Sequence, residues 1–414
     1  MPIRSTLLNG LPIDVRLLFG TRITRLFAYG FLSVILVLYL KEIGLAEAHI
    51  GLLLTLTLIG DTLISLWITT NADRLGRRRM LIAGAGLMLL AGVLFAVTSD
   101  FAMLLIAATI GVISPSGNEV GPFLPIEQAA LSQAIPDERR TQVFAWYNLS
   151  GSFATATGSL CGGGLSEILQ ATGLPPLDSY RAIVVGYAII GLLLGLLFVR
   201  LSSAVESPPR PPVSSSAGLH RSRGIVIRLA ALFSLDAFAG GFVVQSIVAY
   251  WFHVRFGVEE AALGGIFFGA NVLAGVSALT AARVAARVGL INTMVFTHIP
   301  SNVLLMLVPL MPNLPLAIGA LLIRFSISQM DVPTRQSYTM AVVDADERSA
   351  AAGVTGVART IGAALSPSLA APMLASATWL NAPFFIAGGL KIVYDLTLYR
   401  LFRAHRPPEE RQER

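Results

Sequence analysis

The segment Asn71-Ala-Asp-Arg-Leu-Gly-Arg-Arg-Arg79 carries one acidic and four basic side chains in a chain of which only 13% of the residues are charged. The apolar stretches before and after it, 49–70 and 80–99, each have about 20 residues, which is the length that crosses roughly 30 Å of hydrocarbon as a helix. Short loops rich in arginine resist translocation. The segment therefore predicts a membrane protein and marks the face of that protein that stays in the cytoplasm.

The composition predicts an all-α membrane protein. Hydrophobic residues make up 54% of the 414 residues and the mean hydropathy is +0.71, so most of the chain must face lipid or pack inside a lipid-embedded bundle. The net charge of +6 would also suit a nucleic-acid partner. The arginines, however, stand in short clusters at the ends of apolar runs, where lipid headgroups and topology explain them, so we expect no nucleic acid to bind.

About twelve apolar runs are long enough to cross a bilayer as helices. They lie near residues 18–40, 48–69, 80–98, 101–133, 142–170, 182–202, 228–252, 262–282, 290–311, 315–343, 349–374 and 377–402. The loops on the side of the Asn71–Arg79 segment hold most of the arginines, whereas the other side receives little more than Lys41, Arg181 and Arg255. We therefore expect a protein of the cytoplasmic (inner) membrane with both termini in the cytoplasm.

A polar stretch rich in proline and serine, Ser202 to Gly224, divides the runs six and six. This predicts an N-terminal six-helix bundle over 1–202, a cytoplasmic linker over 203–224, a C-terminal six-helix bundle over 225–404 and a cytoplasmic tail over 405–414. Three sequence echoes across the linker favour duplicated halves. They pair Pro125-Ile-Glu127 with Pro333-Thr-Arg335, Gly30-Phe31 with Gly241-Phe242, and Ala72-Asp-Arg-Leu-Gly76 with Ala285-Ala-Arg-Val-Gly289.

The Asn71–Arg79 segment resembles the signature of major facilitator superfamily transporters, glycine-x-leucine-alanine-aspartate-arginine-x-glycine-arginine-arginine. The matching positions are Ala72, Asp73, Arg74, Gly76, Arg77 and Arg78, and Thr69 stands where the family has its first glycine. The resemblance covers nearly the whole chain. It implies twelve transmembrane helices in two pseudo-symmetric six-helix bundles, which transport a small molecule by alternating access. It also implies that Asp73, Arg74, Gly76, Arg77 and Arg78 latch the cytoplasmic helix ends when the inner gate is shut.

The sequence disfavours an enzyme. Its two lysines, Lys41 and Lys391, each follow leucine, so the chain has no P-loop, in which lysine follows glycine. It has no Gly-x-Ser-x-Gly elbow and no cysteine and histidine cluster with the spacing of metal ligands, and Cys161 is its only cysteine. We therefore expect no catalytic residues, no metal and no cofactor.

Ionisable residues inside the apolar runs are the best candidates for a site. A charge near the membrane centre costs at least about 3 kcal/mol, so such residues usually face a cavity or each other. The candidates for substrate binding or proton coupling are Arg25, Asp61, Glu119, Glu127, Asp236, Asp331, Arg335 and Arg359, and Arg22 and Arg324 share their position in apolar runs.

The duplicated halves suggest how these charges pair. Glu127 and Arg335 occupy equivalent places in the two halves, and Arg25 and Asp236 roughly equivalent ones. In the family, these helices line the central cavity. We therefore predict a Glu127–Arg335 pair and an Arg25–Asp236 pair across the cavity, which substrate or protons disrupt during transport. The alternative is that both are static ion pairs that join the halves.

The fourth apolar run is too long for one straight helix. It extends from Phe101 to Pro136 and contains Ser114-Pro-Ser-Gly-Asn-Glu-Val-Gly-Pro122. Broken helices at membrane depth often form transporter binding sites, which makes Asn118 and Glu119 further candidates. The alternative is an extended outer loop with Glu119 in solvent.

The fragment Gly158-Ser-Leu-Cys-Gly162-Gly163 is similar to the glycine-proline-x-x-glycine-glycine core of the family's antiporters, with Ser159 in place of proline. It favours proton-coupled efflux by antiport, although small residues at this spacing also permit close helix packing. Uptake by proton symport is the alternative, and a non-transporting membrane receptor or assembly factor is a third. The expected partners are a small-molecule substrate, protons and the lipid bilayer, and we expect a monomer.

Overall fold

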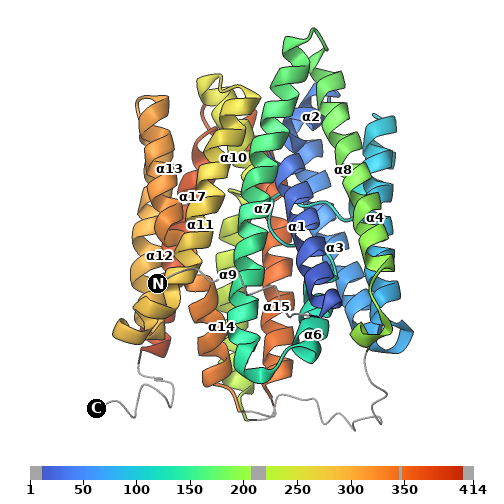
Figure 1. Cartoon of the computed structure of the whole chain (residues 1–414). Helices are drawn as coiled ribbons and strands as arrows, with labels where there is room; N and C mark the ends of the chain where they lie inside the picture. The colour runs from blue at the N-terminus through green and yellow to red at the C-terminus, as the bar shows by residue number, and fades with distance from the viewer. Residues whose placement is uncertain (1–11, 207–220, 345–346, 404–414) are drawn as a thin grey trace, which may run out of the picture.

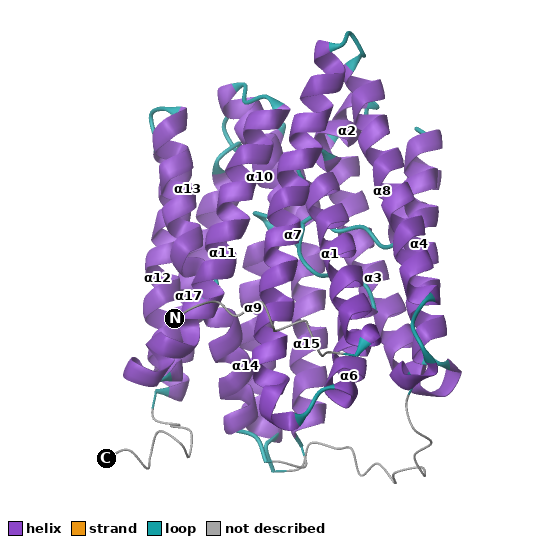
Figure 2. Ribbon diagram, viewed as in Figure 1, coloured by secondary structure: helices purple, strands orange, loops and turns teal. Residues whose placement is uncertain are grey.

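The computed structural model describes residues 12–206, 221–344 and 347–403. Within these ranges all regular elements are helices, which stand side by side in one bundle (Figures 1 and 2). The all-α membrane fold that the apolar runs predict is therefore confirmed. Most of the predicted linker, 207–220, and the predicted tail, 405–414, lie outside the described residues.

We call the helices before the linker the first half and those after it the second half. The first half contains α1 (Ile13–Ser33), α2 (Leu36–Glu42), α3 (Glu47–Leu75), α4 (Arg77–Val97), α5 (Phe101–Ile110), α6 (Phe123–Ala134), α7 (Asp137–Ala171), α8 (Pro176–Val199) and the short η1 (Ser203–Val205). The second half contains α9 (Arg223–Gly241), α10 (Gln245–Phe256), α11 (Glu260–Val288), α12 (Leu290–Leu307), η2 (Val308–Leu310), α13 (Leu314–Ser328), α14 (Asp331–Ala341), α15 (Arg348–Leu365), α16 (Pro367–Leu374) and α17 (Ala382–Phe402).

Seven of the described helical segments are long and apolar enough to cross a membrane by themselves, and α1 with α2, bent by 44°, makes an eighth. The other predicted spans also contain helices, but these are more polar, as in α7, α15 and α17, or broken, as in α5 with α6. Large apolar side chains such as Leu63, Ile189 and Phe296 are about three-fifths exposed. Such exposure suits lipid as the surrounding solvent.

The two halves repeat the same breaks in the same order. In each half the first span is interrupted, at 34–35 and at 242–244, and so is the fourth span, at 111–122 and at 329–330. Glycines lie where the first span crosses the fifth span of its own half. A methyl group added at Gly30 would lie 2.1 Å from the carbonyl oxygen of Thr155, and one at Gly241 would lie 2.6 Å from that of Ala363. Only glycine permits these close approaches.

The halves contact each other mainly at one end of the bundle. We call this the Glu260 end, and the end that carries Asp73 the Asp73 end. α7 packs against α11, and α3 packs against α15 and α16. A methyl group added at Gly163 would lie 2.1 Å from the carbonyl oxygen of Glu260, and one at Gly51 would lie 2.7 Å from that of Pro367. These contacts hold the two halves together at the Glu260 end.

Candidate functional site

A cavity of about 560 Å³ lies between the halves and is lined by both. Its polar lining includes Arg22, Glu119, Asn148 and Thr155 from the first half, and Gln245, Asn271, Arg324, Arg359 and Lys391 from the second. Its apolar lining includes Leu26, Val248, Phe267 and Leu321. Of the site residues predicted from the sequence, Asn118, Glu119 and Arg359 line this cavity.

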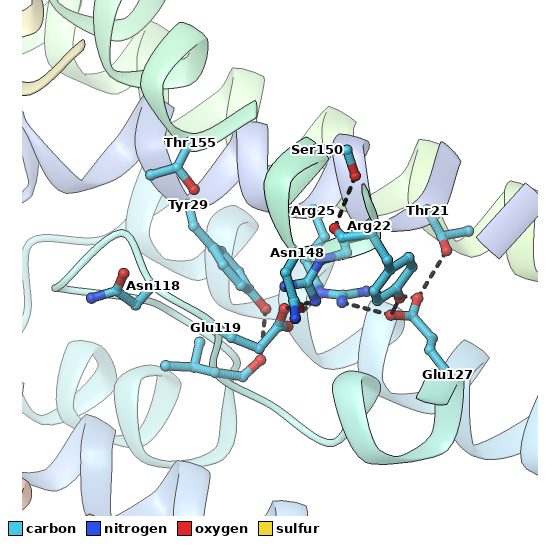
Figure 3. A network of polar contacts seen from close by, with 12 residues as sticks. Thr21, Arg22, Arg25, Tyr29, Asn118, Glu119, Glu127, Asn148, Ser150 and Thr155 are labelled. Atoms are coloured by element: carbon cyan, nitrogen blue, oxygen red, sulfur yellow. Dashed lines mark hydrogen bonds and ion pairs between the residues drawn. The ribbon is translucent and has the colours of Figure 1, made fainter. Parts of the chain in front are cut away.

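In the first half, the predicted residues Arg25, Glu119 and Glu127 form one network (Figure 3). The side chains of Arg25 and Glu127 are fully buried. Arg25 donates two parallel hydrogen bonds to Glu127, of 2.7 and 2.8 Å, and a third of 2.8 Å to Glu119. Thr21 and Tyr147 also donate to Glu127. Such a bidentate pair is a strong and geometrically specific contact.

Arg22 connects this network to the cavity. Its guanidinium donates to Glu119 at 2.7 Å and to Asn148 at 3.2 Å, and all three residues line the cavity (Figure 3). Glu119 therefore accepts hydrogen bonds from two arginines, because Arg25 holds its other oxygen. A change in the charge at Glu119 would reach both the cavity and the buried Arg25–Glu127 pair.

In the second half, the predicted residues Asp236, Asp331 and Arg335 also come together. Arg335 donates to Asp236 at 3.0 Å and to Asp331 at 3.1 Å. Lys391 donates to the other carboxylate oxygen of Asp236 at 2.5 Å. The cluster continues through His298, whose Nε2 lies 3.9 Å from Asp236 and whose Nδ1 lies 2.9 Å from Asp395.

The predicted pairing across the cavity is wrong. Glu127 pairs with Arg25 and Arg335 pairs with Asp236, so each pair lies within one half. The residues do occupy equivalent positions in the two halves. However, α6, which carries Glu127, packs beside α1 of its own half, and α14 and α9 have the corresponding positions in the second half. Fixed packing within a half satisfies these charges, whereas the cavity separates the halves.

The fourth span is broken as predicted, and residues 111–122 cross the interior without forming a helix. Side chains from neighbouring helices bind its backbone oxygens: Tyr29 donates to Val120 at 3.0 Å, Thr155 to Gly117 at 3.2 Å and Tyr187 to Val112 at 2.6 Å. Irregular backbone at membrane depth requires such partners. The outer-loop alternative is wrong, because the Glu119 side chain is only 16% exposed and is held by Arg22 and Arg25.

Asp61 approaches the broken segment from α3. Its carboxylate accepts hydrogen bonds from the Gly121 N–H at 2.7 Å and from Ser65 at 3.3 Å. Gly121 has a φ of 83°, a conformation that favours glycine. Asp61 is 7% exposed, and among the described residues no cation forms an ion pair with it. Glu127 and Asp236, in contrast, each form an ion pair with a buried arginine.

The Asp73 segment is tied to its own half. Arg77 donates to Asp73 at 2.7 Å and to Gln133 of α6 at 2.5 Å. Glu206, just after η1, accepts from the backbone N–H groups of Arg77 and Arg78 at 2.6 and 3.3 Å. A carboxylate in this position satisfies unpaired donors at the start of α4 and the dipole of that helix. Asp73 and Arg74 are exposed, and Gly76 turns the chain with a φ of 101°.

The Gly158–Gly163 fragment forms a close-packing surface. Methyl groups added at Gly158 and Gly162 would each lie 2.1 Å from a carbonyl oxygen of α1. Ser159, where the family's antiporters carry proline, accepts a 3.1 Å hydrogen bond from Gln245 of the other half, and Gln245 also donates to Ser33 at 2.8 Å. The helix-packing interpretation of this fragment is therefore confirmed, and the serine contributes a polar contact between the halves.

Sequence reasoning missed several members of these networks. Lys391 and Asp395 lie in the run 377–402, and the rule that selected Asp236 would also have selected both. His298 also lies in an apolar run, and its two ring nitrogens lie 3.9 Å from Asp236 and 2.9 Å from Asp395. Glu206 follows the sixth span at 182–202, and no local pattern shows that it reaches α4, since its partners are about 130 residues away in the chain.

Comparisons with known proteins agree with this architecture. The sequence profile of the Major Facilitator Superfamily matches residues 18–367. The chain is 30% identical over 421 residues to the uncharacterized membrane protein YJR124C of Saccharomyces cerevisiae, and the alignment covers 94% of each chain. It is 25% identical over 139 residues to the quinolone resistance protein NorA of Staphylococcus aureus, which is 34% of each chain.

A solved structure shares the fold. A bacterial homologue of the human lysosomal transporter Spinster, in an inward-facing and unoccupied conformation, aligns with a TM-score of 0.73 at 14% identity, covering 95% of this chain and 98% of that one. The sequence profile matches far more than half of the chain and includes all of the first half's transmembrane helices from Leu18 onward. The protein therefore belongs to the major facilitator superfamily.

Proposed function

We propose that the protein moves a small molecule across the membrane by alternating access, as a proton-coupled antiporter that works in the direction of efflux. The observation that carries this proposal is the cavity of about 560 Å³ between two halves, lined by charged and polar side chains of both. A cavity enclosed by one rigid half could not be exposed to alternate sides by rocking. A cavity between the two halves can be exposed to each side in turn when the halves rock against each other.

The Glu260 end is the closed side in this conformation. Tyr180 donates to Glu260 at 2.5 Å across the boundary between the halves. The Ala261 N–H donates to Glu167 at 3.0 Å, also across that boundary. With the Asp73 end assigned to the cytoplasm from the arginine distribution, the cavity is inward-facing. Outward opening then requires the Glu260 contacts to break.

The Asp73 segment is proposed as the latch of the opposite end. Asp73 and Arg74 are exposed here, whereas Arg77 is buried and held by Asp73, Gln133 and Glu206. Arg77 thus fixes the turn within the first half. The exposed Asp73 and Arg74 can meet the second half when the cytoplasmic ends approach each other.

Asp61 is the carboxylate that we propose to carry the coupling proton. Glu127 and Asp236 are neutralised by buried cations, so protonating either one would break an ion pair. Protonating Asp61 breaks none. It would weaken the hydrogen bond from the Gly121 N–H, and Gly121 lies in the same broken segment as Glu119. A proton at Asp61 would thereby act on the cavity wall through residues 119–121.

Efflux is favoured over uptake by the similarity to NorA, which is named a quinolone resistance protein, and by the resemblance of the Gly158–Gly163 fragment to the antiporter core. Uptake by proton symport uses the same cavity and the same Asp61, and differs in that the proton and the substrate are bound at the same time instead of in turn. A receptor or assembly factor would move no substrate.

The test is a transport assay with the purified full-length chain in proteoliposomes of known orientation and an imposed pH gradient. In an antiporter, a proton gradient directed into the cytoplasmic side drives substrate out of that side. In a symporter, the same gradient drives substrate in. Transport that does not depend on the pH gradient would contradict proton coupling. If no compound that binds is transported, the proposed transport function is wrong.

A further inference from the structure

The charges that line the cavity are unequal in number. Four cationic side chains line it, and Glu119 is the one carboxylate among the described lining residues. The cations are Arg22, Arg324, Arg359 and Lys391. Glu119 is itself held by Arg22 and Arg25 at 2.7 and 2.8 Å. The cavity therefore presents an excess of positive charge to whatever occupies it.

Two of these cations form no ion pair with any of the described residues. Lys391 is held by Asp236 at 2.5 Å, and Arg22 is held by Glu119. Arg324 and Arg359 form no ion pair, and the Nε atom of each is buried without a hydrogen-bond partner. Arg324 lies over the ring of Phe325, 4.9 Å from the ring centroid. Guanidinium groups without an ion pair at membrane depth are costly.

Nearby carboxylates cannot readily supply the missing partners. Asp236 is already shared by Lys391 and Arg335, and Asp331 is bound by Arg335. Asp395 accepts from His298 and Asn302 at 2.9 and 3.1 Å. A partner for Arg324 and Arg359 must therefore enter through the cavity.

We propose that Arg324 and Arg359 bind the anionic group of the transported molecule, so that the substrate is an organic anion. This inference rests on the proposed transport function and assigns a substrate class to its cavity. Guanidinium groups match carboxylate, sulfonate and phosphate oxygens through paired N–H donors. Arg324 comes from α13 and Arg359 from α15, so both positive groups belong to the second half.

The rest of the cavity fits an organic body rather than a bare inorganic ion. Leu26, Val248, Phe267 and Leu321 provide apolar lining, and a cavity of about 560 Å³ is much larger than a phosphate ion needs. Asn148 of the first half can hydrogen-bond to polar groups at the opposite end of the molecule. A ligand held by both halves in this way would couple its binding to their relative position.

The experiment measures charge selectivity on the purified full-length protein in detergent. Thermal melting is followed with three aromatic anions, benzoate, phenyl phosphate and naphthalene-2-sulfonate, with benzylamine as a cation, with benzyl alcohol as a neutral analogue, and with inorganic phosphate. We expect saturable stabilisation by at least one aromatic anion and none by benzylamine or benzyl alcohol. Stabilisation by inorganic phosphate alone, by benzylamine, or by none of the anions would overturn the proposal.

Matched variants locate the site. Arg324→Gln and Arg359→Gln should each weaken binding of the stabilising anion about tenfold or more, since each removes a charge-assisted contact. Arg359→Lys should retain part of the affinity, because it keeps the charge but loses the planar fork. Arg255→Gln, at an exposed position of α10 near the Glu260 end, is the control and should bind normally. Unchanged affinity in the Arg324 and Arg359 variants together would refute the assignment.

Transport of the same compounds separates this proposal from the one on which it rests. An anion that binds through Arg324 and Arg359 but never crosses proteoliposome membranes would leave the anion site in place and reject the transporter. Transport of benzylamine that is unaffected by Arg324→Gln and Arg359→Gln would keep the transporter and reject the anionic substrate.

Discussion

Arg25 and Glu127 form a doubly hydrogen-bonded ion pair inside the first half, and Asp236 and Arg335 form the equivalent pair in the second half with the signs reversed. In each half, one partner comes from the first span and the other from the second part of the broken fourth span. The two halves therefore keep the same places for the charges and exchange their signs. Each pair holds its own half together and leaves the cavity between the halves for other groups.

Breaking the Arg25–Glu127 pair should strongly destabilise the first half. Glu127→Gln leaves Glu119 as the one charged partner of the Arg25 guanidinium among the described residues, and losing one partner of a buried pair costs about 3–5 kcal/mol. Unfolding in detergent measures the loss. Arg181→Gln, which removes the partly exposed partner of the exposed Asp178 in a 3.6 Å ion pair, is the control and should change stability by at most about 1 kcal/mol. Equal effects of the two variants would contradict the structural role of the buried pair.

The contact between Gly162 and α1 predicts a sharp difference between two neighbouring glycines. A methyl group at Gly162 would lie 2.1 Å from the carbonyl oxygen of Phe31, whereas one at Gly164 would meet nothing within 4 Å. Gly162→Ala should therefore destabilise the protein by about 1–3 kcal/mol. Gly164→Ala should leave stability unchanged or raise it, since alanine favours helix by roughly 1 kcal/mol. Melting curves of both variants, side by side, test this prediction.

Loosening the Glu260 end should shift the protein toward the outward-open state. Tyr180→Phe removes the hydroxyl that donates to Glu260 and leaves the packing of the ring. Hydrogen bonds to charged groups contribute about 1.5–3 kcal/mol, so the open fraction should rise about tenfold or more. The rate at which a maleimide labels an introduced Ala261→Cys, in a Cys161→Ser background, reports the opening. An unchanged labelling rate would show that this hydrogen bond does not hold the Glu260 end closed.

The Asp73 latch predicts a kinetic effect rather than a binding effect. Asp73→Asn should slow turnover while substrate affinity changes little, because Asp73 is exposed at the end of the bundle and outside the cavity lining. Glu206→Gln should cost about 1 kcal/mol of stability, since it weakens the cap on α4. Turnover and affinity measured on the same preparation test the Asp73 variant, and melting curves test the Glu206 variant. A normal turnover rate in Asp73→Asn would contradict the latch and leave the segment only its effect on membrane topology.

Proton coupling through Asp61 predicts a separation of exchange from accumulation. Asp61→Asn cannot titrate, so it should still exchange substrate down its own gradient while an imposed pH gradient no longer drives accumulation. Ser65→Ala, which removes only the weaker 3.3 Å donor to Asp61, is the control and should remain coupled. Accumulation by Asp61→Asn that still follows the pH gradient would place the coupling proton elsewhere.

The amino-acid sequence by itself determined that the protein lies in a lipid bilayer, which class of fold it has and to which superfamily it belongs. Runs of about 20 apolar residues require a bilayer, and backbone hydrogen bonding in lipid leaves helices as the local solution. The charge-rich Asn71–Arg79 segment predicted the family, and the echoes around Glu127 and Arg335 predicted equivalent places in two halves. The break in the fourth span was predicted as well, because Ser114–Pro122 combines prolines and glycines that disrupt a helix.

The tertiary structure decided which charges meet. Spacing along the chain gives equivalent positions but no distances between helices, so the sequence placed Arg25 opposite Asp236, whereas packing of α1 beside α6 brings it to Glu127. The same limit concealed Glu206 at the start of α4 and the Ser159–Gln245 contact between the halves. Only the packed bundle shows that Arg324 and Arg359 form no ion pair within the described part of the chain, because the carboxylates near them are bound by other partners. Ion pairing depends on separations of a few ångströms, and these arise only when the helices have packed.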